Sequence, residues 1–543
     1  MMDGSPFPSQ LPLRPADEVM TLKRLGVMQP TRLSFLRVLM RNLQGAKVTR
    51  PVWNMDEAGH GHAVYTVDFK GHAYSLVAFS QALPDADRTD RVIATAWDAA
   101  FVLYDGVPDN AEIARLSAEV PRQEAGRLGP RDLVLSRANK SVRLFEHVVE
   151  ALRAGQQPDA KLIDATGYLM RTTAVYANGK FGLSDRAAYA QRPGLSGPFA
   201  AEMLTVWLIR GFTHDLVEHV GRGTLARKLK RHLGIGNATG LGMAPFLVSH
   251  PLLLNAWFTV RESALARVLA QNVISASKAG ELWMAAAQAQ DYLESWNVAD
   301  EAAMAAIRDL REEWRNYRPQ LPPLDQSGAL RAAFELAREG SGALQELAAA
   351  WIIEPFGELV DDLADVQATA AVQKLDAAMS CAEMRELLET HAQWALQTDF
   401  SSPEATAQFW YVSEEKLEPR LGDRATEAGA DRETPLDSAR QIAALHRALP
   451  HDTTPLWQFL ATHPEHRLAA RRAQSLPACP YAEVRANLLG QEAAPIHLLR
   501  AKLSFFGATR FDPKSRLWTR VTLAQGLPLS DELDRPAPWL PTL

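Results

Sequence analysis

Residues 198–220, with the sequence PFAAEMLTVWLIRGFTHDLVEHV, restrict the fold of this chain more than any other segment. A helix this long and this apolar is stable only when other elements cover it, so we expect it to be buried. Its apolar run, from Ala200 to Phe212, contains Glu202 and Arg210 and falls short of the roughly 20 residues that span a bilayer. We therefore expect a buried helix and no membrane partner.

The composition is that of an ordinary folded protein of 543 residues, with 47% hydrophobic and 22% charged residues. The 58 basic and 64 acidic residues leave a net charge of −6, which argues against nucleic-acid binding, because that function favours a basic domain or surface. The two cysteines, Cys381 and Cys479, cannot form a disulfide framework and fit a reducing compartment. Residues 1–20 lack the basic and apolar regions of a signal peptide. We therefore expect a cytoplasmic protein.

The clearest β pattern lies near the N-terminus. Apolar and polar residues alternate in residues 61–69 (GHAVYTVDF), and residues 70–71 (Lys-Gly) separate this run from residues 72–80 (HAYSLVAFS). Alternation on both sides of a two-residue turn that contains glycine predicts a hairpin. Residues 92–106 predict either a third strand or a buried helix, because periodicity does not distinguish the two.

Residues 503–525 predict a second hairpin with its turn at residues 512–515. We expect the two hairpins to pair, because their apolar strands need partners. The chain between them is interpreted as helical, so the predicted fold is mainly α, a multi-helical bundle with small N- and C-terminal β-hairpins, α+β overall. Predicted helices include residues 109–119, 135–154, 159–177, 198–220, 251–272, 276–295 and 299–317. The predicted domains are an N-terminal α+β unit (1–108), a helical core that carries the site (109–317), a second helical region with an exposed loop near 423–437 (318–500), and a C-terminal hairpin and tail (501–543).

The long helix carries the predicted catalytic residues. Glu202 falls on a mostly apolar face, where a carboxylate must pair with a cation or stay protonated. Arg210, His214 and Glu218 follow one another at intervals of four residues on the neighbouring stripe. We expect Glu202 or His214 to move a proton and Arg210 to hold an anion. The alternatives are a structural salt bridge at Glu202 and a solvated, ion-paired face at the other three.

The segment after this helix has an unusual charge distribution. From His219 to Arg261 it contains no Asp or Glu. In a chain with a net charge of −6, this asymmetry predicts a local positive field. The cations of this segment are Arg222, Arg227, Lys228, Lys230, Arg231 and Arg261.

A glycine-rich stretch, residues 234–242, lies at the centre of this basic segment. We interpret it as a turn in which Asn237 or Thr239 caps a helix whose free N–H groups face an anion, with His250 at the same cleft. The main hypothesis therefore places Glu202 and residues 234–242 at one cavity. The alternative is a glycine-rich helix crossing beside a solvated basic surface.

Two further clusters contain candidate substrate-binding residues. Arg171 lies on a predicted helix, and Lys180 follows an Asn-Gly pair at the end of that helix. Tyr411, Lys416 and Arg420 lie close together just before the predicted exposed loop, and loops of this kind often border active sites. The alternatives are a helix C-cap with a nearby cation for the first cluster and an exposed charged turn for the second.

Metal binding is an alternative hypothesis. His60 and His62 form a His-x-His pair at the first predicted strand, and His214 with Glu218 also has a workable ligand spacing. A di-iron centre of the bundle type needs Glu-x-x-His from two helices, whereas this chain has that spacing only from Glu57 to His60, in a loop. The alternative cofactor is a divalent metal such as Fe or Zn.

The chain lacks the P-loop, protein-kinase, Gly-x-Ser-x-Gly and His-Glu-x-x-His motifs. The main hypothesis is a soluble, cytoplasmic enzyme that acts on a small anionic metabolite, a carboxylate or a phosphate, by acid–base chemistry of lyase, isomerase or hydrolase type. It predicts no cofactor and no nucleic-acid partner, and it allows a homodimer. The alternatives are a metal-dependent oxygenase or hydrolase and a non-catalytic helical binding or scaffold protein.

Overall fold

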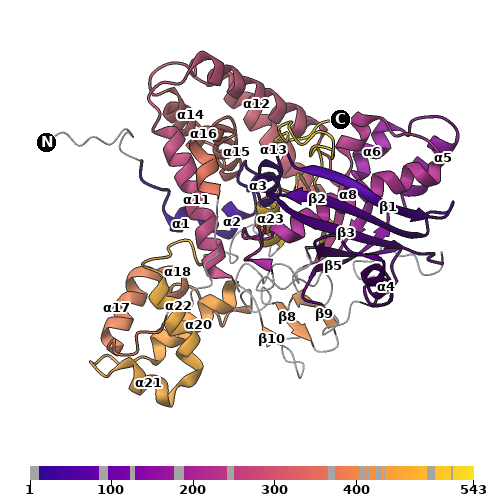
Figure 1. Cartoon of the computed structure of the whole chain (residues 1–543). Helices are drawn as coiled ribbons and strands as arrows, with labels where there is room; N and C mark the ends of the chain where they lie inside the picture. The colour runs from indigo at the N-terminus through magenta and orange to yellow at the C-terminus, as the bar shows by residue number, and fades with distance from the viewer. Residues whose placement is uncertain are drawn as a thin grey trace.

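The largest sheet of the described chain has nine strands, and its N-terminal strands lie on the right of Figure 1. Its strand order is β1-β2-β3-β4-β5-β6-β7-β12-β11, and all neighbours are antiparallel except β6 and β7. The strands are β1 (Lys47–Met55), β2 (Gly61–Phe69), β3 (His72–Ser80), β4 (Ala99–Asp105), β5 (Asp132–Lys140), β6 (Tyr168–Thr172), β7 (Gly234–Gly240), β11 (Arg510–Pro513) and β12 (Trp518–Leu523). The computed structural model describes residues 11–84, 96–122, 129–175, 189–240, 250–364, 374–403, 405, 410–413, 416–421, 431–432, 435–485, 496–514 and 518–543.

Both predicted hairpins are present. Strands β2 and β3 pair antiparallel with Phe69 opposite His72. Lys70 and Gly71 both adopt positive φ, at 54° and 76°, as a tight two-residue hairpin turn requires. Strand β4 continues this sheet, so the ambiguous segment at residues 92–106 contains a strand. The C-terminal hairpin is β11–β12, but the structure corrects its predicted bounds. Residues 503–506 end a helix, and Asp512 and Pro513, which were placed in the turn, pair with Arg520 and Thr519 inside the strands.

The predicted helical bundle is wrong, because β5, β6 and β7 form the middle of a large mixed sheet. Residues 135–154 and 159–177 were each expected to be one helix, but each begins or continues as a strand of that sheet. Strand β5 is buried at eight of its nine positions and β6 at all five. A strand covered on both faces loses the alternation of apolar and polar residues by which strands are recognised in a sequence. The two hairpins also do not pair directly, since β4 to β7 lie between them.

The glycine-rich segment at residues 234–242 is not a turn over the part that the structure describes, residues 234–240, which form strand β7. A Cβ atom on Gly236 would lie 2.6 Å from the ring of Tyr168 on β6. A Cβ atom on Gly234 would lie 2.3 Å from the carbonyl oxygen of Leu523 on β12. These glycines therefore allow close packing of neighbouring strands.

The long apolar helix is confirmed as α8, and it lies along one face of the sheet. Helix α4 packs against the other face, where Ile113 and Leu116 share a cluster with Val102 and Leu135. Among the described helices, none is both long and apolar enough to cross a membrane. The helices of this part are α3 (Phe35–Asn42), α4 (Asn110–Glu119), α5 (Phe145–Arg153), α6 (Ala160–Thr166), α8 (Ala200–Gly221), α9 (Arg227–His232) and α23 (Ile496–Phe506).

A helical body packs beside the sheet and continues its core (Figure 1). A buried ion network ties the N-terminal segment into this body: Arg14 binds Glu262 on α11 at 2.7 Å and Glu346 on α15 at 3.0 Å. The elements are α1 (Ala16–Val19), α2 (Leu22–Leu25), α11 (Pro251–Leu269), α12 (Ala276–Ser295), α13 (Glu301–Tyr317), η3 (Arg318–Gln320), α14 (Ala329–Arg338), α15 (Gly342–Ile353), α16 (Gly357–Val360) and η4 (Asp361–Ala364).

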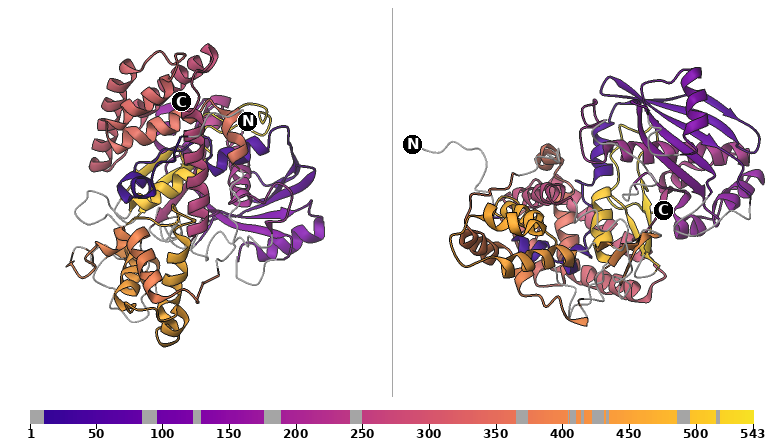
Figure 2. Two further views of the ribbon diagram at one scale, coloured as in Figure 1. Left: turned by 90° about the vertical axis from the view of Figure 1, so that its left-hand side faces the viewer. Right: turned by 90° about the horizontal axis from the view of Figure 1, so that it is seen from below.

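A smaller helical module has a hydrophobic core of its own and projects away from the sheet (Figures 1 and 2). The large sheet takes strands from the first, second and fourth of the predicted domains, so it joins parts of the chain that the sequence separates. The elements of the module are α17 (Cys381–His391), α18 (Gln393–Leu396), α20 (Pro435–Ala448), α21 (Leu456–Thr462), η6 (Pro464–His466) and α22 (Arg467–Ser475). A separate three-stranded sheet contains β8 (Trp410–Ser413), β9 (Lys416–Leu421) and β10 (Asp431–Arg432).

Candidate functional site

Glu202 lies in the first turn of α8 and is buried, as expected. The hydroxyl of Tyr189 donates a hydrogen bond to its Oε1 at 2.9 Å. This contact satisfies part of a carboxylate that burial would otherwise destabilise. The geometry is compatible with both the structural and the catalytic interpretation of Glu202.

Arg210 is fully committed to backbone carbonyls. Its Nε donates to the oxygen of Leu233 at 2.7 Å, and Nη1 donates to that of Pro528 at 3.2 Å. Its Nη2 donates to the oxygens of Lys230 and Arg231 at 3.1 and 2.8 Å. Burial without a carboxylate contact lowers the pKa of Arg210 to about 9. Arg210 therefore joins the end of α9 to the C-terminal segment, and its geometry favours this structural role over substrate binding.

His214 is buried one turn further along α8. Burial lowers its pKa well below 6.5, the charges of Arg210 and Lys230 lower it further, and a hydrogen bond with the Leu233 backbone opposes them. The imidazole is therefore neutral at pH 7, and within the described part of the chain its Nε2 has no hydrogen-bond partner. Glu218, the third member of the predicted ladder, pairs with Lys230 at 2.8 Å.

Most cationic side chains of the acid-free segment after α8 form ion pairs in the fold. Carboxylates from other parts of the chain reach five of its six cations. Three of these carboxylates come from distant parts of the chain, which a local count misses, whereas Glu218 and Glu262 lie just outside the two ends of the segment. The pairs are Arg222–Glu57, Arg227–Asp531, Lys230–Glu218, Arg231–Glu532 and Arg261–Glu262.

The other predicted binding residues are distributed over the fold. Asn237 is buried in β7, and neither polar atom of its side chain has a partner among the described residues. Arg171 is buried in β6, Thr239 is on β7, and the exposed His250 precedes α11. Tyr411 is on β8, while Lys416 and Arg420 are on β9, in the separate three-stranded sheet. Lys180 lies outside the described residues.

The structure does not gather the alternative metal ligands in the part of the chain that it describes. His60 Nδ1 lies 3.5 Å from a carboxylate oxygen of Asp56, and the ring of His62 lies 6.5 Å from that of Phe79. Across the described ranges, no group of three or more His, Cys, Asp or Glu residues could hold a metal ion. The predicted pairs His60–His62 and His214–Glu218 therefore lack the further ligands that a site needs.

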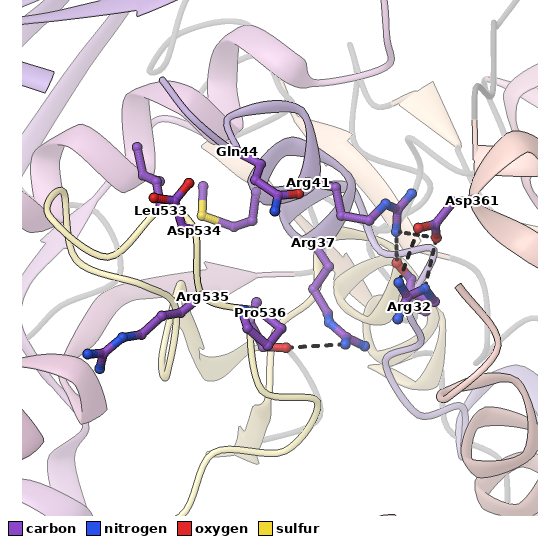
Figure 3. Close-up of a pocket in the computed structure, with 11 residues that line it drawn as sticks. Arg32, Arg37, Arg41, Gln44, Asp361, Leu533, Asp534, Arg535 and Pro536 are labelled. Carbon is purple, nitrogen blue, oxygen red and sulfur yellow. Dashed lines mark hydrogen bonds and ion pairs between the residues drawn. The ribbon is translucent and has the colours of Figure 1, made fainter. Parts of the chain in front are cut away.

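A cavity of about 190 Å³ lies between α3 and the C-terminal segment, and its lining includes Arg32, Arg37, Arg41 and Arg535 (Figure 3). Arg32, Arg37 and Arg41 lie together on one side of it, and we call these three residues the arginine cradle. Arg535 extends from the C-terminal segment at the rim (Figure 3). The remaining lining residues are Met40, Gln44, Asp361, Leu533, Asp534, Pro536 and Ala537.

Two carboxylates hold the cradle. Asp361 accepts from Arg32 Nε at 2.8 Å and from Arg32 Nη2 at 3.1 Å, and it lies 3.3 Å from Arg41 Nη1. Glu354 accepts from both Nη1 and Nη2 of Arg37, so that pair is also two-pronged but end-on. Three guanidinium groups therefore share two carboxylates, and the cradle keeps an excess of positive charge.

Arg41 is the least neutralised member of the cradle. Burial lowers its pKa to about 10, with Arg32 and Arg37 also lowering it and Asp361 opposing them. Its Nη1 donates to the backbone oxygen of Arg32 at 2.9 Å. Its Nε and Nη2 have no hydrogen-bond partner within the described ranges of the chain. These two donors are available to an anion in the cavity.

The sequence around α3 contains a signal that could have identified this cavity. Arg37 and Arg41 lie four residues apart on one short helix, and like charges at this spacing repel each other unless an anion lies between them. The tail is fixed over the helix because Trp539 Nε1 donates to the oxygen of Pro30 at 2.8 Å. None of the candidate site residues that we named from the sequence lies on this helix.

Comparisons of the chain with protein-family models, with curated proteins and with solved structures found no match. The function must therefore be argued from the geometry of this chain.

Proposed function

We propose that this protein binds a small anion, a carboxylate or a phosphate, in the arginine cradle. The observation that carries the proposal is the excess of guanidinium groups over carboxylates around one cavity, with two donors of Arg41 left for a ligand. Guanidinium groups bind both anions through paired N–H donors. The volume of about 190 Å³ is below the range of roughly 300–1,000 Å³ that drug-sized ligands occupy, so it favours a small ion or the charged end of a larger molecule.

The cradle is also held in position before any ligand arrives. Arg32 Nη1 donates to the backbone oxygen of Glu354 at 3.2 Å, and Arg37 Nη2 donates to that of Ala537 at 3.4 Å. Together with the Arg41 contact to the Arg32 backbone, these bonds restrict all three side chains. A ligand therefore meets donors that need little reorganisation, which favours affinity.

Isothermal titration calorimetry with sodium phosphate, malonate and citrate at constant ionic strength tests this proposal. We expect saturable binding of at least one anion and at least a tenfold weaker affinity in Arg41→Gln, since a hydrogen bond to a charged group contributes about 1.5–3 kcal/mol. Arg338→Gln is the matched control, because Arg338 is an exposed helical arginine that pairs only weakly with Glu335, at 3.5 Å. Absence of binding, or equal affinities in wild type and Arg41→Gln, would refute the proposal.

Catalysis is a separate matter from this binding. Acid–base chemistry by Glu202 or His214 stays a prediction, and the neutral His214 with its unpartnered Nε2 is the observation that favours it within the described chain. The cytoplasmic location, the homodimer and the metal-dependent alternative also stay predictions.

A further inference from the structure

We infer that Asp361 is a built-in occupant of the arginine cradle and that the external ligand is a carboxylate that replaces it on Arg32 and Arg41. This inference rests on the proposed function and deepens it, because it names the class of anion and the group that competes with it.

The contacts of Asp361 reproduce the way a guanidinium group binds a carboxylate ligand. Its two oxygens accept from Arg32 Nε and Nη2 at 2.8 and 3.1 Å, the side-on fork in which two parallel bonds match a planar carboxylate. Arg41 adds a third contact at 3.3 Å. A planar anion therefore already fits these donors without any change of the site.

Asp361 differs from Glu354, the other carboxylate of the cradle, in how firmly it is held. The side chain of Asp361 is 36% exposed, whereas that of Glu354 is 11% exposed. Exposed ion pairs are weak, because water competes for both partners. Asp361 is therefore the carboxylate that a ligand can replace, while Glu354 keeps Arg37 in position.

A second cavity can accommodate the Asp361 side chain after a ligand displaces it. Asp361 also lines this second cavity of about 550 Å³, whose lining includes Lys278 and Glu358. A carboxylate that turns into this open space remains solvated, so it avoids the free-energy cost of burial. Arg32 and Arg41 keep their backbone contacts during the exchange, so the donors stay where they are.

When a tethered group competes for the cradle, the apparent affinity equals the intrinsic affinity multiplied by the fraction of molecules in which the cradle is vacant. Removing the Asp361 charge must therefore tighten binding of the external carboxylate. Loss of any negative charge near the cavity would also tighten anion binding through long-range electrostatics. A variant of Asp534 separates the two explanations. Asp534 lines the same cavity and carries the same charge, but among the described residues it forms no ion pair with the cradle.

The experiment measures malonate, succinate and phosphate binding by calorimetry in wild type, Asp361→Asn and Asp534→Asn, after melting curves show that each variant folds. We expect malonate or succinate to bind about tenfold more tightly to Asp361→Asn and less than threefold more tightly to Asp534→Asn. We also expect both dicarboxylates to bind more tightly than phosphate to wild type and to Asp361→Asn, because a planar carboxylate matches the side-on donors of Arg32. Asp361→Ser provides the same loss of charge if the Asn variant is unstable.

Three results would overturn the inference while leaving the proposed function standing. Equal gains in the two Asn variants would show a general electrostatic effect. Weaker binding by Asp361→Asn would show that Asp361 assists the ligand. Tighter binding of phosphate than of either dicarboxylate would remove the carboxylate assignment. Absence of binding in all three proteins would instead refute the proposed function and this inference together.

Discussion

Glu346 is the group whose loss should destabilise the fold most clearly. It lies on α15 with no exposed surface, where it pairs with Arg14 at 3.0 Å, with Arg24 at 3.5 Å and with Arg261. Glu262 is the other carboxylate that contacts Arg14 and Arg261. In the variant Glu346→Gln, these buried guanidinium groups would share one carboxylate fewer, and Arg14 would lose its tie to α15.

The pKa of Glu346 gives the magnitude of its contribution to the free energy of unfolding. Burial alone would raise it, but the charges of Arg14, Arg261 and Arg24 outweigh burial and lower it from 4.5 to about 2. A carboxyl group with a depressed folded-state pKa stabilises the fold above its unfolded pKa, and this stability is lost as the pH falls from about 4.5 to about 2. The difference between these pKa values is worth about 3 kcal/mol at pH 7. Breaking a buried ion pair from one side costs about 3–5 kcal/mol, which agrees.

Urea unfolding followed by tryptophan fluorescence measures this effect at pH 7 and pH 3. We expect the free energy of unfolding of Glu346→Gln to be about 3–5 kcal/mol below that of wild type at pH 7. At pH 3 we expect this difference in unfolding free energy to be about 2 kcal/mol smaller. Glu312→Gln is the control, because Glu312 is exposed on α13, and we expect it to change stability by less than about 0.5 kcal/mol. A loss below about 1 kcal/mol, or a gap that is independent of pH, would refute the reasoning.

Three further variants test the packing. Gly236→Ala should destabilise the fold by about 1–3 kcal/mol, because its Cβ would meet the Tyr168 ring at 2.6 Å, and an unchanged urea midpoint would contradict this. Gly280→Ala should stabilise it by up to about 1 kcal/mol, since Gly280 lies inside α12 with open space around it, and a lower melting temperature would count against that explanation. Arg210→Lys should cost about 1–3 kcal/mol in urea unfolding, because an ammonium group cannot reach all four carbonyls that Arg210 binds, and wild-type stability would disprove that role.

The elements that the sequence predicted correctly are those whose pattern is local. Strands β2 and β3 alternate in polarity across a Lys-Gly turn, and α8 carries an apolar stretch too long to be anything but a buried helix. Strands β5, β6 and β7 gave no such pattern. Strands β5 and β6 are buried almost throughout. Strand β7 contains glycines that are needed because Tyr168 and Leu523, on other strands, pack closely against them. A single sequence does not reveal partners of that kind.

The same limit applies to charge, and it decided where we expected the anion site. The basic segment from His219 to Arg261 looked positive in part because three of its carboxylate partners, Glu57, Asp531 and Glu532, come from distant positions. The cradle contains fewer cations than that segment, and all of them come from ten residues around α3. Only two carboxylates reach them, from positions 317 and 329 residues further along the chain. A positive site therefore forms where the fold brings fewer carboxylates than cations, and not where the sequence lacks acids. Repelling arginines at helical spacing on a buried helix are the local sign of such a site.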